Sequence, residues 1–236
     1  MHTALVTGGT RGIGLAIARG IVATGGCVMI TGRDEASVAA AVRALDPGGS
    51  TAPRVLGRAA DVRDRAAMDR VVAETVERFG SLNVLVNNAG VGVFTDVASM
   101  TDEEWARVID TNLTGVFYCT RAAIPALKKA GGGWVINIAS LAGRNYFPRG
   151  AAYCASKAGL VAFSESLMQE VRFDDIRVTC VMPGSVATDF DGPSGEREPA
   201  AWKLTADDVA AVVLDLLRHP ARSLPSKIEL RPAKTK

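Results

Sequence analysis

The chain contains 236 residues, enough for one large α/β domain or two small ones. Apolar residues make up 48% of the chain, charged residues make up 22%, and the formal net charge is only +2, which excludes a disordered chain. This near-neutral balance gives no electrostatic reason to expect nucleic acid as a partner. The longest apolar stretches fall short of the roughly 18 residues that a membrane-spanning helix requires.

The start of the chain and its cysteines bear on the cellular compartment. The sequence Met1-His2-Thr3 runs directly into strand-like sequence without a basic leader or a cleavage site, so we expect no signal peptide. Its cysteines lie far apart among apolar neighbours, at Cys27, Cys119, Cys154 and Cys180. This pattern favours buried free thiols in a reducing compartment and excludes a CxxC metal or redox site. We therefore expect a cytoplasmic protein without a metal centre.

Short β-branched runs alternate with longer stretches of helical spacing along the whole chain. The predicted strands cover residues 3–7, 27–31, 54–59, 83–87, 133–139, 176–182 and 227–231. The predicted helices cover residues 12–24, 34–45, 64–79, 101–129, 152–172 and 205–218. Such alternation predicts a doubly wound α/β fold, in which helices cover both faces of a parallel sheet.

No composition shift or linker divides the chain, so we predict one doubly wound domain over residues 1–236. The segment 187–203 carries several glycines and prolines and directly follows a predicted strand. Because α/β folds bind ligands at the carboxyl ends of their strands, we expect this segment to be a substrate lid.

The first predicted strand runs into a glycine-rich turn in which residues 7–14 read TGGTRGIG. Glycines permit a tight turn and let phosphate oxygens reach backbone N–H groups at the start of a helix. Gly9 and Gly14 have the spacing of a nucleoside triphosphate loop, but Leu15 and Ala16 stand where that loop needs Lys and Ser/Thr. A triphosphatase is therefore excluded, whereas an ordinary glycine-rich turn remains an alternative.

The end of the second predicted strand bears on the type of cofactor. About 20 residues after such a turn, a dinucleotide site usually places an acid for the ribose 2′-hydroxyl or an arginine for a 2′-phosphate. Arg33 stands there, and Arg11 in the turn is placed to reach the same group. Asp34 is the alternative ligand, although it also stands where the next helix needs an N-cap. We therefore predict NADP(H), with NAD(H) as the less favoured alternative.

Tyr153 and Lys157 lie four residues apart near the start of a predicted helix, so they share one face. An ammonium group beside a phenol favours the phenolate and lowers a pKa that starts at about 10. Such a tyrosine suits a general acid for carbonyl reduction. Taken alone, the pair also fits a solvated helix face. Ser140 favours the catalytic interpretation because it follows the apolar strand 133–139, at the edge where the sheet presents its chemistry.

Together these motifs resemble the short-chain dehydrogenase/reductase family in its shorter, single-domain form. The matching segments are Thr7-Gly8 with Gly12-Ile13-Gly14, Asp61-Val62, Asn87-Asn88-Ala89-Gly90, Asn112, Ser140, Tyr153 with Lys157, and Pro183-Gly184 with Thr188. The resemblance implies a seven-stranded Rossmann-type sheet and a nicotinamide cofactor. It also implies a homo-oligomer, a dimer or homotetramer, formed through the apolar faces of the helices 101–129 and 152–172.

The resemblance further implies roles for individual residues. Tyr153 would be the acid/base, Ser140 would orient the carbonyl, and Lys157 would lower the tyrosine pKa while binding the nicotinamide ribose. Asn112 would hold a water that connects Lys157 to solvent, and Asn87 would brace the sheet. The implied cofactor contacts, besides Tyr153 and Lys157, are Gly8, Thr10, Arg11, Gly12, Ile13, Gly14, Arg33, Asp61, Val62, Asn88, Ala89, Gly90, Pro183, Gly184, Val186 and Thr188.

The predicted substrate end of the site is mostly apolar. Its expected residues are Val93, Phe94, Leu141, Tyr146, Phe147, Phe190 and Trp202. We expect Arg144 and Arg149 to be the only charges nearby, and the pocket therefore to favour an uncharged ketone or aldehyde. The last strand, over 228–232, lacks the glycine pair with which many members of the family end. The resemblance therefore does not define which residues form the floor of the pocket.

The sequence thus predicts an NADP(H)-dependent oxidoreductase that transfers a hydride between nicotinamide and a carbonyl or secondary alcohol. One alternative is a 3-oxoacyl-[acyl-carrier-protein] reductase, for which Lys128 and Lys129 would have to form a basic docking surface beside Asp174 and Asp175. Another is a dinucleotide-binding protein without turnover, which would not need a matched proton donor. We expect a small-molecule substrate and neither nucleic acid nor membrane as a partner.

Overall fold

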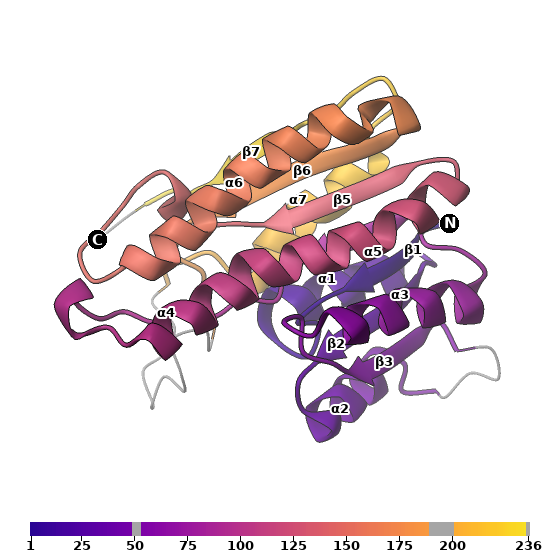
Figure 1. Cartoon of the computed structure of the whole chain (residues 1–236). Helices are drawn as coiled ribbons and strands as arrows, with labels where there is room; N and C mark the ends of the chain where they lie inside the picture. Colours follow the sequence, from indigo (N-terminus) through magenta and orange to yellow (C-terminus); the bar gives the residue numbers. More distant parts are fainter. Residues whose placement is uncertain (49–52, 189–200, 235–236) are drawn as a thin grey trace.

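A seven-stranded parallel sheet forms the centre of the molecule, as the sequence predicts (Figure 1). The computed structural model describes residues 1–48, 53–188 and 201–234. The strands are β1 (Thr3–Val6), β2 (Cys27–Gly32), β3 (Val55–Ala59), β4 (Val84–Asn87), β5 (Gly133–Ile138), β6 (Ile176–Pro183) and β7 (Lys227–Leu230). They are ordered β3-β2-β1-β4-β5-β6-β7, and all neighbouring pairs are parallel. The chain changes direction across the sheet between β1 and β4, which makes that position the switch point of a doubly wound fold.

Helices cover both faces of the sheet. The α-helices are α1 (Gly12–Ala23), α2 (Glu35–Leu45), α3 (Arg65–Phe79), α4 (Asp102–Ile109), α5 (Gly115–Lys129), α6 (Ala151–Val171) and α7 (Ala206–Arg218). In Figure 1, α3, α5 and α6 lie on the near face of the sheet, whereas α1 and α7 pack behind it. This arrangement confirms the predicted Rossmann-type architecture. Within the described ranges, no helix is long and apolar enough to cross a membrane.

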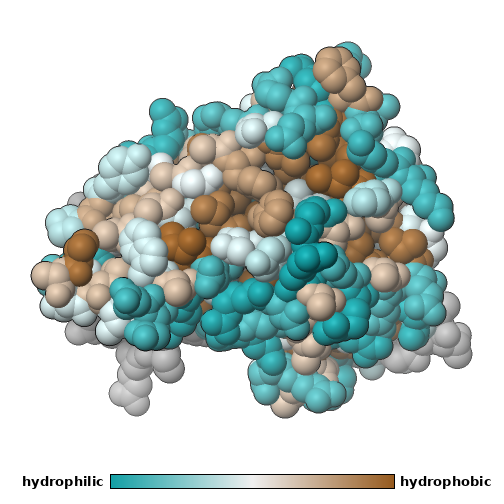
Figure 2. Space-filling view, in the orientation of Figure 1, coloured by the Kyte–Doolittle hydropathy of each residue, from teal (hydrophilic) through white to brown (hydrophobic). Residues whose placement is uncertain are grey.

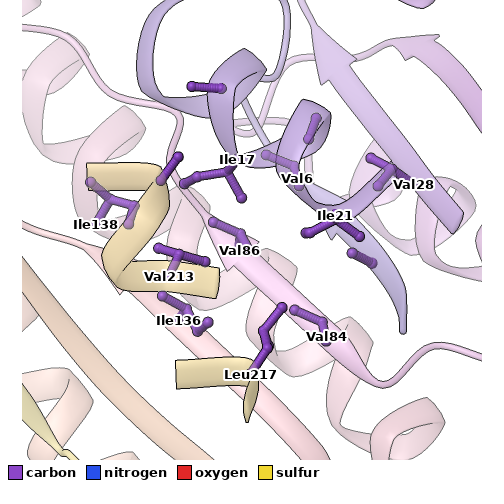
Figure 3. Close-up of a cluster of buried hydrophobic side chains, with 14 of the residues drawn as sticks. Val6, Ile17, Ile21, Val28, Val84, Val86, Ile136, Ile138, Val213 and Leu217 are labelled. Atoms are coloured by element: carbon purple, nitrogen blue, oxygen red, sulfur yellow. The ribbon is translucent and has the colours of Figure 1, made fainter. Parts of the chain in front are cut away.

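The side chains of each central strand alternate between two hydrophobic clusters. In β4, Val84 and Val86 pack with α1 and α7, whereas Leu85 packs with α3 and α5. Figure 3 shows the first cluster, in which Ile17 of α1 and Val213 of α7 lie close to the strand side chains. Full burial of each such side chain stabilises the fold by roughly 1.5–3 kcal/mol. Burial on both faces explains why the strands read as nearly continuous apolar runs.

The predicted helix over 101–129 is helical throughout but not regular. A π-helical turn, Asp110–Thr114, joins α4 to α5. The predicted helix is confirmed, and the π-helical turn is a local widening that the spacing of apolar residues did not indicate. The wider turn holds Asn112, whose side chain is fully buried, and π-helical turns of this kind are frequent at functional sites.

The predicted lid, 187–203, lies mainly outside the described residues, and Phe190 lies outside them too. The two ends of the segment are held together next to β6. The Ala187 amide donates to the Leu204 carbonyl at 2.7 Å, and the Leu204 amide donates to the Ser185 carbonyl at 3.0 Å. The segment therefore leaves and rejoins the fold at the carboxyl edge of the sheet.

Candidate active site

The carboxyl ends of the strands open onto one cleft with a volume of about 1100 Å³. The turn after β1, the ends of β2 and β3, the loops after β4 and β5, the start of α6 and the segments after β6 and β7 all line it. This edge, beside the switch point, is where open α/β sheets bind ligands. Every predicted catalytic and cofactor-contacting residue lines the cleft except Gly14 and Asn112.

The glycine-rich turn after β1 has a conformation that side chains would block. Gly8 and Gly12 have φ angles of +64° and +54°, in the left-handed region that favours glycine. A Cβ atom on Gly14 would lie 2.3 Å from the Gly8 carbonyl oxygen. The Asn88 amide nitrogen donates to the Thr7 and Gly8 carbonyls, each at 3.0 Å, and fixes the turn. The result is an open cradle at the N-terminus of α1, which fits the pyrophosphate of a dinucleotide.

Two arginines and one carboxylate stand near the end of β2. Arg11 and Arg33 line the cleft, whereas Asp34 does not. The Asp34 carboxylate accepts hydrogen bonds from the Ser37 amide at 2.8 Å and from the Ser37 hydroxyl at 2.6 Å. The bonds from Ser37 lower the pKa of the Asp34 carboxyl, which caps α2. The structure thus commits Asp34 to the helix and leaves the two arginines at the cleft.

Asp61 and Val62 follow β3 at the same edge. The Arg63 guanidinium binds the Asp61 carboxylate, with 2.6 Å between Nη2 and Oδ2, and holds the pKa of that carboxyl below its usual range. Val62 packs tightly against α5, since a Cβ on Gly115 would lie 2.8 Å from its side chain. A fixed acceptor beside an apolar side chain suits the amino group and ring of an adenine.

Ser140, Tyr153 and Lys157 all line the cleft, as the resemblance requires. The Lys157 Nζ atom lies 5.8 Å from the centre of the Tyr153 ring and donates to the Ile138 carbonyl oxygen at 2.9 Å. The Ser140 hydroxyl oxygen accepts from the Ala142 amide at 3.1 Å, which fixes its position just beyond β5. Two segments, the loop after β5 and helix α6, thus bring a hydroxyl, a phenol and an amine to one place.

Lys157 is unusual because it is a lysine inside the protein. Its exposed fraction is only 4%, and burial lowers its pKa from 10.5 to about 8. A charged amine in a low-dielectric site is costly, so a fold rarely keeps one without a function. A strongly perturbed titratable group in a cleft is a mark of a functional site.

Asn112 lies behind the cleft. Its Oδ1 atom accepts from the Val91 amide at 2.8 Å, and its Nδ2 atom donates to the Val91 carbonyl at 2.9 Å and to the Ser156 hydroxyl at 3.0 Å. Gly90 separates it from the lysine: a Cβ there would lie 3.3 Å from Asn112 Oδ1 and 3.7 Å from Lys157 Nζ. Asn112 therefore ties the loop after β4 to α6 directly beside the buried amine.

Asn87 braces the sheet, as predicted. Its amide nitrogen donates to the Thr120 hydroxyl at 3.0 Å and to Asn137 Oδ1 at 2.8 Å. The Asn137 amide nitrogen in turn donates to the Ser164 hydroxyl at 2.8 Å. These bonds link β4 and β5 to α5 and α6 beneath the site.

The segment after β6 forms another wall of the cleft, through Pro183, Gly184, Val186 and Thr188. The Gly184 amide donates to the Leu230 carbonyl of β7 at 2.7 Å. A Cβ atom on Gly12 would lie 3.5 Å from the Thr188 methyl group, so this segment reaches back to the glycine-rich turn.

The predicted apolar substrate end is only partly correct. Phe94, Leu141, Phe147 and Trp202 line the cleft, and the Phe94 ring lies edge-on to Tyr153 with 5.6 Å between ring centres. Two expected members do not line it: Val93 is buried in a separate cluster, and Tyr146 is 69% exposed.

The expectation about charges near the pocket is wrong. Arg149 donates to the Phe94 carbonyl at 3.0 Å, and Arg144 pairs with Glu229. Two further cations, Lys203 and Arg231, line the cleft. Arg231 directly follows the last strand, so the rule that ligands bind at the carboxyl ends of strands could have identified it. Lys203 precedes α7 and follows no strand, so this rule does not identify it.

The family is established by comparison with known proteins. A sequence model of the short chain dehydrogenase family matches residues 2–199, and the chain belongs to this family of oxidoreductases. It is 40% identical over 227 residues to a 3-oxoacyl-[acyl-carrier-protein] reductase of Synechocystis sp., covering 93% of this chain and 90% of the relative. It is 35% identical over 187 residues to a 3alpha-hydroxysteroid dehydrogenase of Mediterraneibacter gnavus, covering 79% and 74%.

Solved structures agree with this assignment. An alcohol dehydrogenase from the archaeon Thermococcus sibiricus, complexed with 5-hydroxy-NADP, superposes with a TM-score of 0.91 at 28% identity, covering 100% of this chain and 98% of that one. A variant of actinorhodin polyketide ketoreductase with NADPH superposes with a TM-score of 0.87 at 33% identity, covering 98% and 96%.

Proposed function

We propose that the protein is an NADP(H)-dependent carbonyl reductase or alcohol dehydrogenase. The observation that carries the proposal is the single cleft in which Ser140, Tyr153 and the buried Lys157 meet a glycine-rich cradle at a helix N-terminus. When bound, a nicotinamide dinucleotide would supply the hydride that the carbonyl carbon receives during reduction. The chain itself supplies the proton, the position of the substrate and the electrostatic environment.

The residues divide this work by their chemistry. The Ser140 hydroxyl donates a hydrogen bond to the substrate carbonyl oxygen, and the Tyr153 hydroxyl gives that oxygen its proton. In the direction of oxidation, the Tyr153 phenolate takes the proton back. The positive charge of the Lys157 ammonium favours that phenolate. Asn112 positions the loop after β4 next to the amine.

Arg11 and Arg33 support NADP(H) over NAD(H), because guanidinium groups match a phosphate in charge and geometry. Asp34, the alternative ligand for a ribose hydroxyl, is committed to capping α2. The relatives solved with NADP(H) and its analogue support the same preference.

Reduction of a 3-oxoacyl thioester is the second candidate, supported by the 40% identical reductase. An acyl-carrier protein needs a basic docking surface, however, and Lys128 pairs with Asp174 at 2.8 Å. That ion pair reduces the positive charge of the possible docking surface formed by Lys128 and Lys129. We therefore favour a free small-molecule carbonyl as the substrate.

We also propose a cytoplasmic homo-oligomer, a dimer or tetramer. Its apolar contact would include Trp105 of α4 and Phe117 of α5, which are 45% and 42% exposed. Figure 2 shows apolar side chains gathered over α5 and α6 in this view, beside a polar surface over α3. The cysteines of the described residues are free and buried, which supports a reducing compartment.

The test of the catalytic assignment is Tyr153→Phe. The variant keeps the ring and its contact with Phe94 but loses the proton donor, so turnover with ketones should fall by about 10²-fold or more while NADPH still binds. The rate of NADPH absorbance loss over a panel of ketones, aldehydes and acyl thioesters measures this. Tyr146→Phe, in an exposed residue outside the cleft, is the control. Retention of most activity by Tyr153→Phe would show that another residue is the acid.

A further inference from the structure

Three charged side chains form an ionic cluster at the end of β7, which we call the Arg144–Glu229–Arg231 cluster. Arg144 Nη1 lies 2.8 Å from Glu229 Oε1, and Arg231 Nη2 lies 2.8 Å from Glu229 Oε2. The two arginines hold the pKa of the Glu229 carboxyl below its usual range. The cluster therefore carries one negative and two positive charges at neutral pH, with a net charge of about +1.

The cluster borders the cleft. Arg231 and Pro232 line it, and Pro232 lies against the segment after β6, since a Cβ on Gly184 would be 3.0 Å from Pro232 Cδ. The same Cβ would lie 3.1 Å from Leu141 Cδ1, the residue that follows Ser140. Arg144 ends the short turn that begins at Leu141. The cluster is thus built from the segments that frame the reacting carbonyl in the proposed function.

We propose that Arg231, with its guanidinium held in place by Glu229, binds an oxyanion of the substrate, either a carboxylate or a phosphate. A guanidinium has five N–H donors, and the bond to Glu229 uses one amino group of Arg231. The remaining donors form the planar fork that matches carboxylate and phosphate oxygens. Arg144 adds the positive charge that keeps Glu229 from neutralising the site.

The sheet geometry separates the strand end next to the reacting carbonyl from the strand end next to Arg231. β5 and β7 are two strands apart, and neighbouring strands lie about 4.8 Å apart, so their carboxyl ends are separated by about 10 Å. Ser140 follows β5 and Arg231 follows β7. The inferred substrate therefore carries its anionic group at the end remote from the carbonyl. This inference rests on the proposed function and replaces the expectation of an uncharged substrate.

The experiment compares pairs of substrates that differ only in charge. Oxo acids of increasing chain length are assayed with NADPH against their methyl esters, and a phosphorylated ketone is assayed against its unphosphorylated parent. The variants are Arg231→Gln and Glu229→Gln. Arg218→Gln, which removes an arginine paired with Asp215 on α7, is the control.

We expect the wild type to prefer the anionic member of at least one pair in kcat/KM, mainly through KM. Arg231→Gln should lower kcat/KM for that member by about tenfold, the effect of one charge-assisted hydrogen bond. Glu229→Gln should raise kcat/KM for that member, because it removes the competing negative charge while the amide oxygen still accepts from Arg231 and holds it in place. The substrate pair for which the wild type prefers the anionic member shows whether the bound group is a carboxylate or a phosphate. The uncharged esters should react equally well in all variants.

Equal use of anionic and neutral members by the wild type, or the same loss in Arg231→Gln for both, would overturn the inference while leaving the proposed function intact. A loss of anionic preference in Glu229→Gln would overturn it too, because an oxyanion bound by Arg231 should gain affinity when the competing negative charge is removed. Failure to reduce any ester or acid would instead count against the proposed function. Melting temperatures within a few degrees of wild type establish that the variants fold.

Discussion

Replacing Lys157 by methionine should make the protein more stable and less active. The fold keeps this amine buried, and its pKa falls from 10.5 to about 8 because burial disfavours the charge. That shift corresponds to about 3 kcal/mol of unfavourable free energy in the folded protein at pH 7. Lys157→Met removes this cost but leaves the Ile138 carbonyl without its donor, a loss of about 1–3 kcal/mol. We therefore expect the free energy of unfolding without cofactor to rise by up to about 2 kcal/mol.

The pH dependence separates this explanation from better packing by methionine. Between pH 8 and 10.5 the unfolded chain binds a proton at Lys157 that the folded chain releases, so the stability of the wild type rises with pH. The advantage of Lys157→Met should therefore be largest below pH 8 and disappear by about pH 10.5. Urea unfolding of both proteins at pH 7, 8.5 and 10 measures the difference. Lys129→Met, in an exposed residue of α5, is the control. An advantage that did not change with pH would refute the reasoning.

Three other predictions concern the cofactor, the glycine-rich turn and assembly. Arg33→Ala should weaken NADPH binding by about tenfold and leave NADH unchanged, since one charge-assisted hydrogen bond is lost; fluorescence titration measures both, and equal affinities in the wild type would contradict the assignment. Gly14→Ala should destabilise the protein by about 1–3 kcal/mol and impair cofactor binding, because the added Cβ would lie 2.3 Å from a backbone carbonyl oxygen. Thermal unfolding measures the loss, and Gly48→Ala, whose added Cβ would have no atom within 4 Å, is the control. Light scattering should show a dimer or tetramer that a Trp105→Glu, Phe117→Glu double variant converts to monomer, and a monomeric wild type at micromolar concentration would contradict the proposal.

Local chemistry made much of this molecule predictable. The inner strands are buried on both faces, so they are apolar along nearly their whole length, and the apolar residues of the intervening helices recur with helical spacing. The glycines at 8, 12 and 14 are required by positive φ angles or by a close approach, which are properties of the backbone itself. Because a parallel sheet gathers the carboxyl ends of its strands, Ser140 and Tyr153 could be expected in one cleft without knowledge of any distance.

Long-range pairings explain what the sequence analysis missed. Arg144 and Glu229 are 85 residues apart, and nothing in either local sequence shows that they pair. The π-helical turn around Asn112 forms where that side chain binds the backbone of Val91, 21 residues away. Periodicity over 101–129 detects the helix but not this local widening. Both features depend on tertiary contacts, and both lie at the cleft or directly behind it.

The carboxyl edge of the sheet holds the feature that is most costly to the fold. It contains the buried amine of Lys157, with a π-helical turn directly behind it. Away from this edge, the side chains of the inner strands are apolar and pack against helices on both faces of the sheet. A ligand that binds only the folded state returns stability by mass action. A dinucleotide bound in this cleft, with its phosphates at the N-terminus of α1, would therefore raise the free energy of unfolding and offset the cost of burying Lys157.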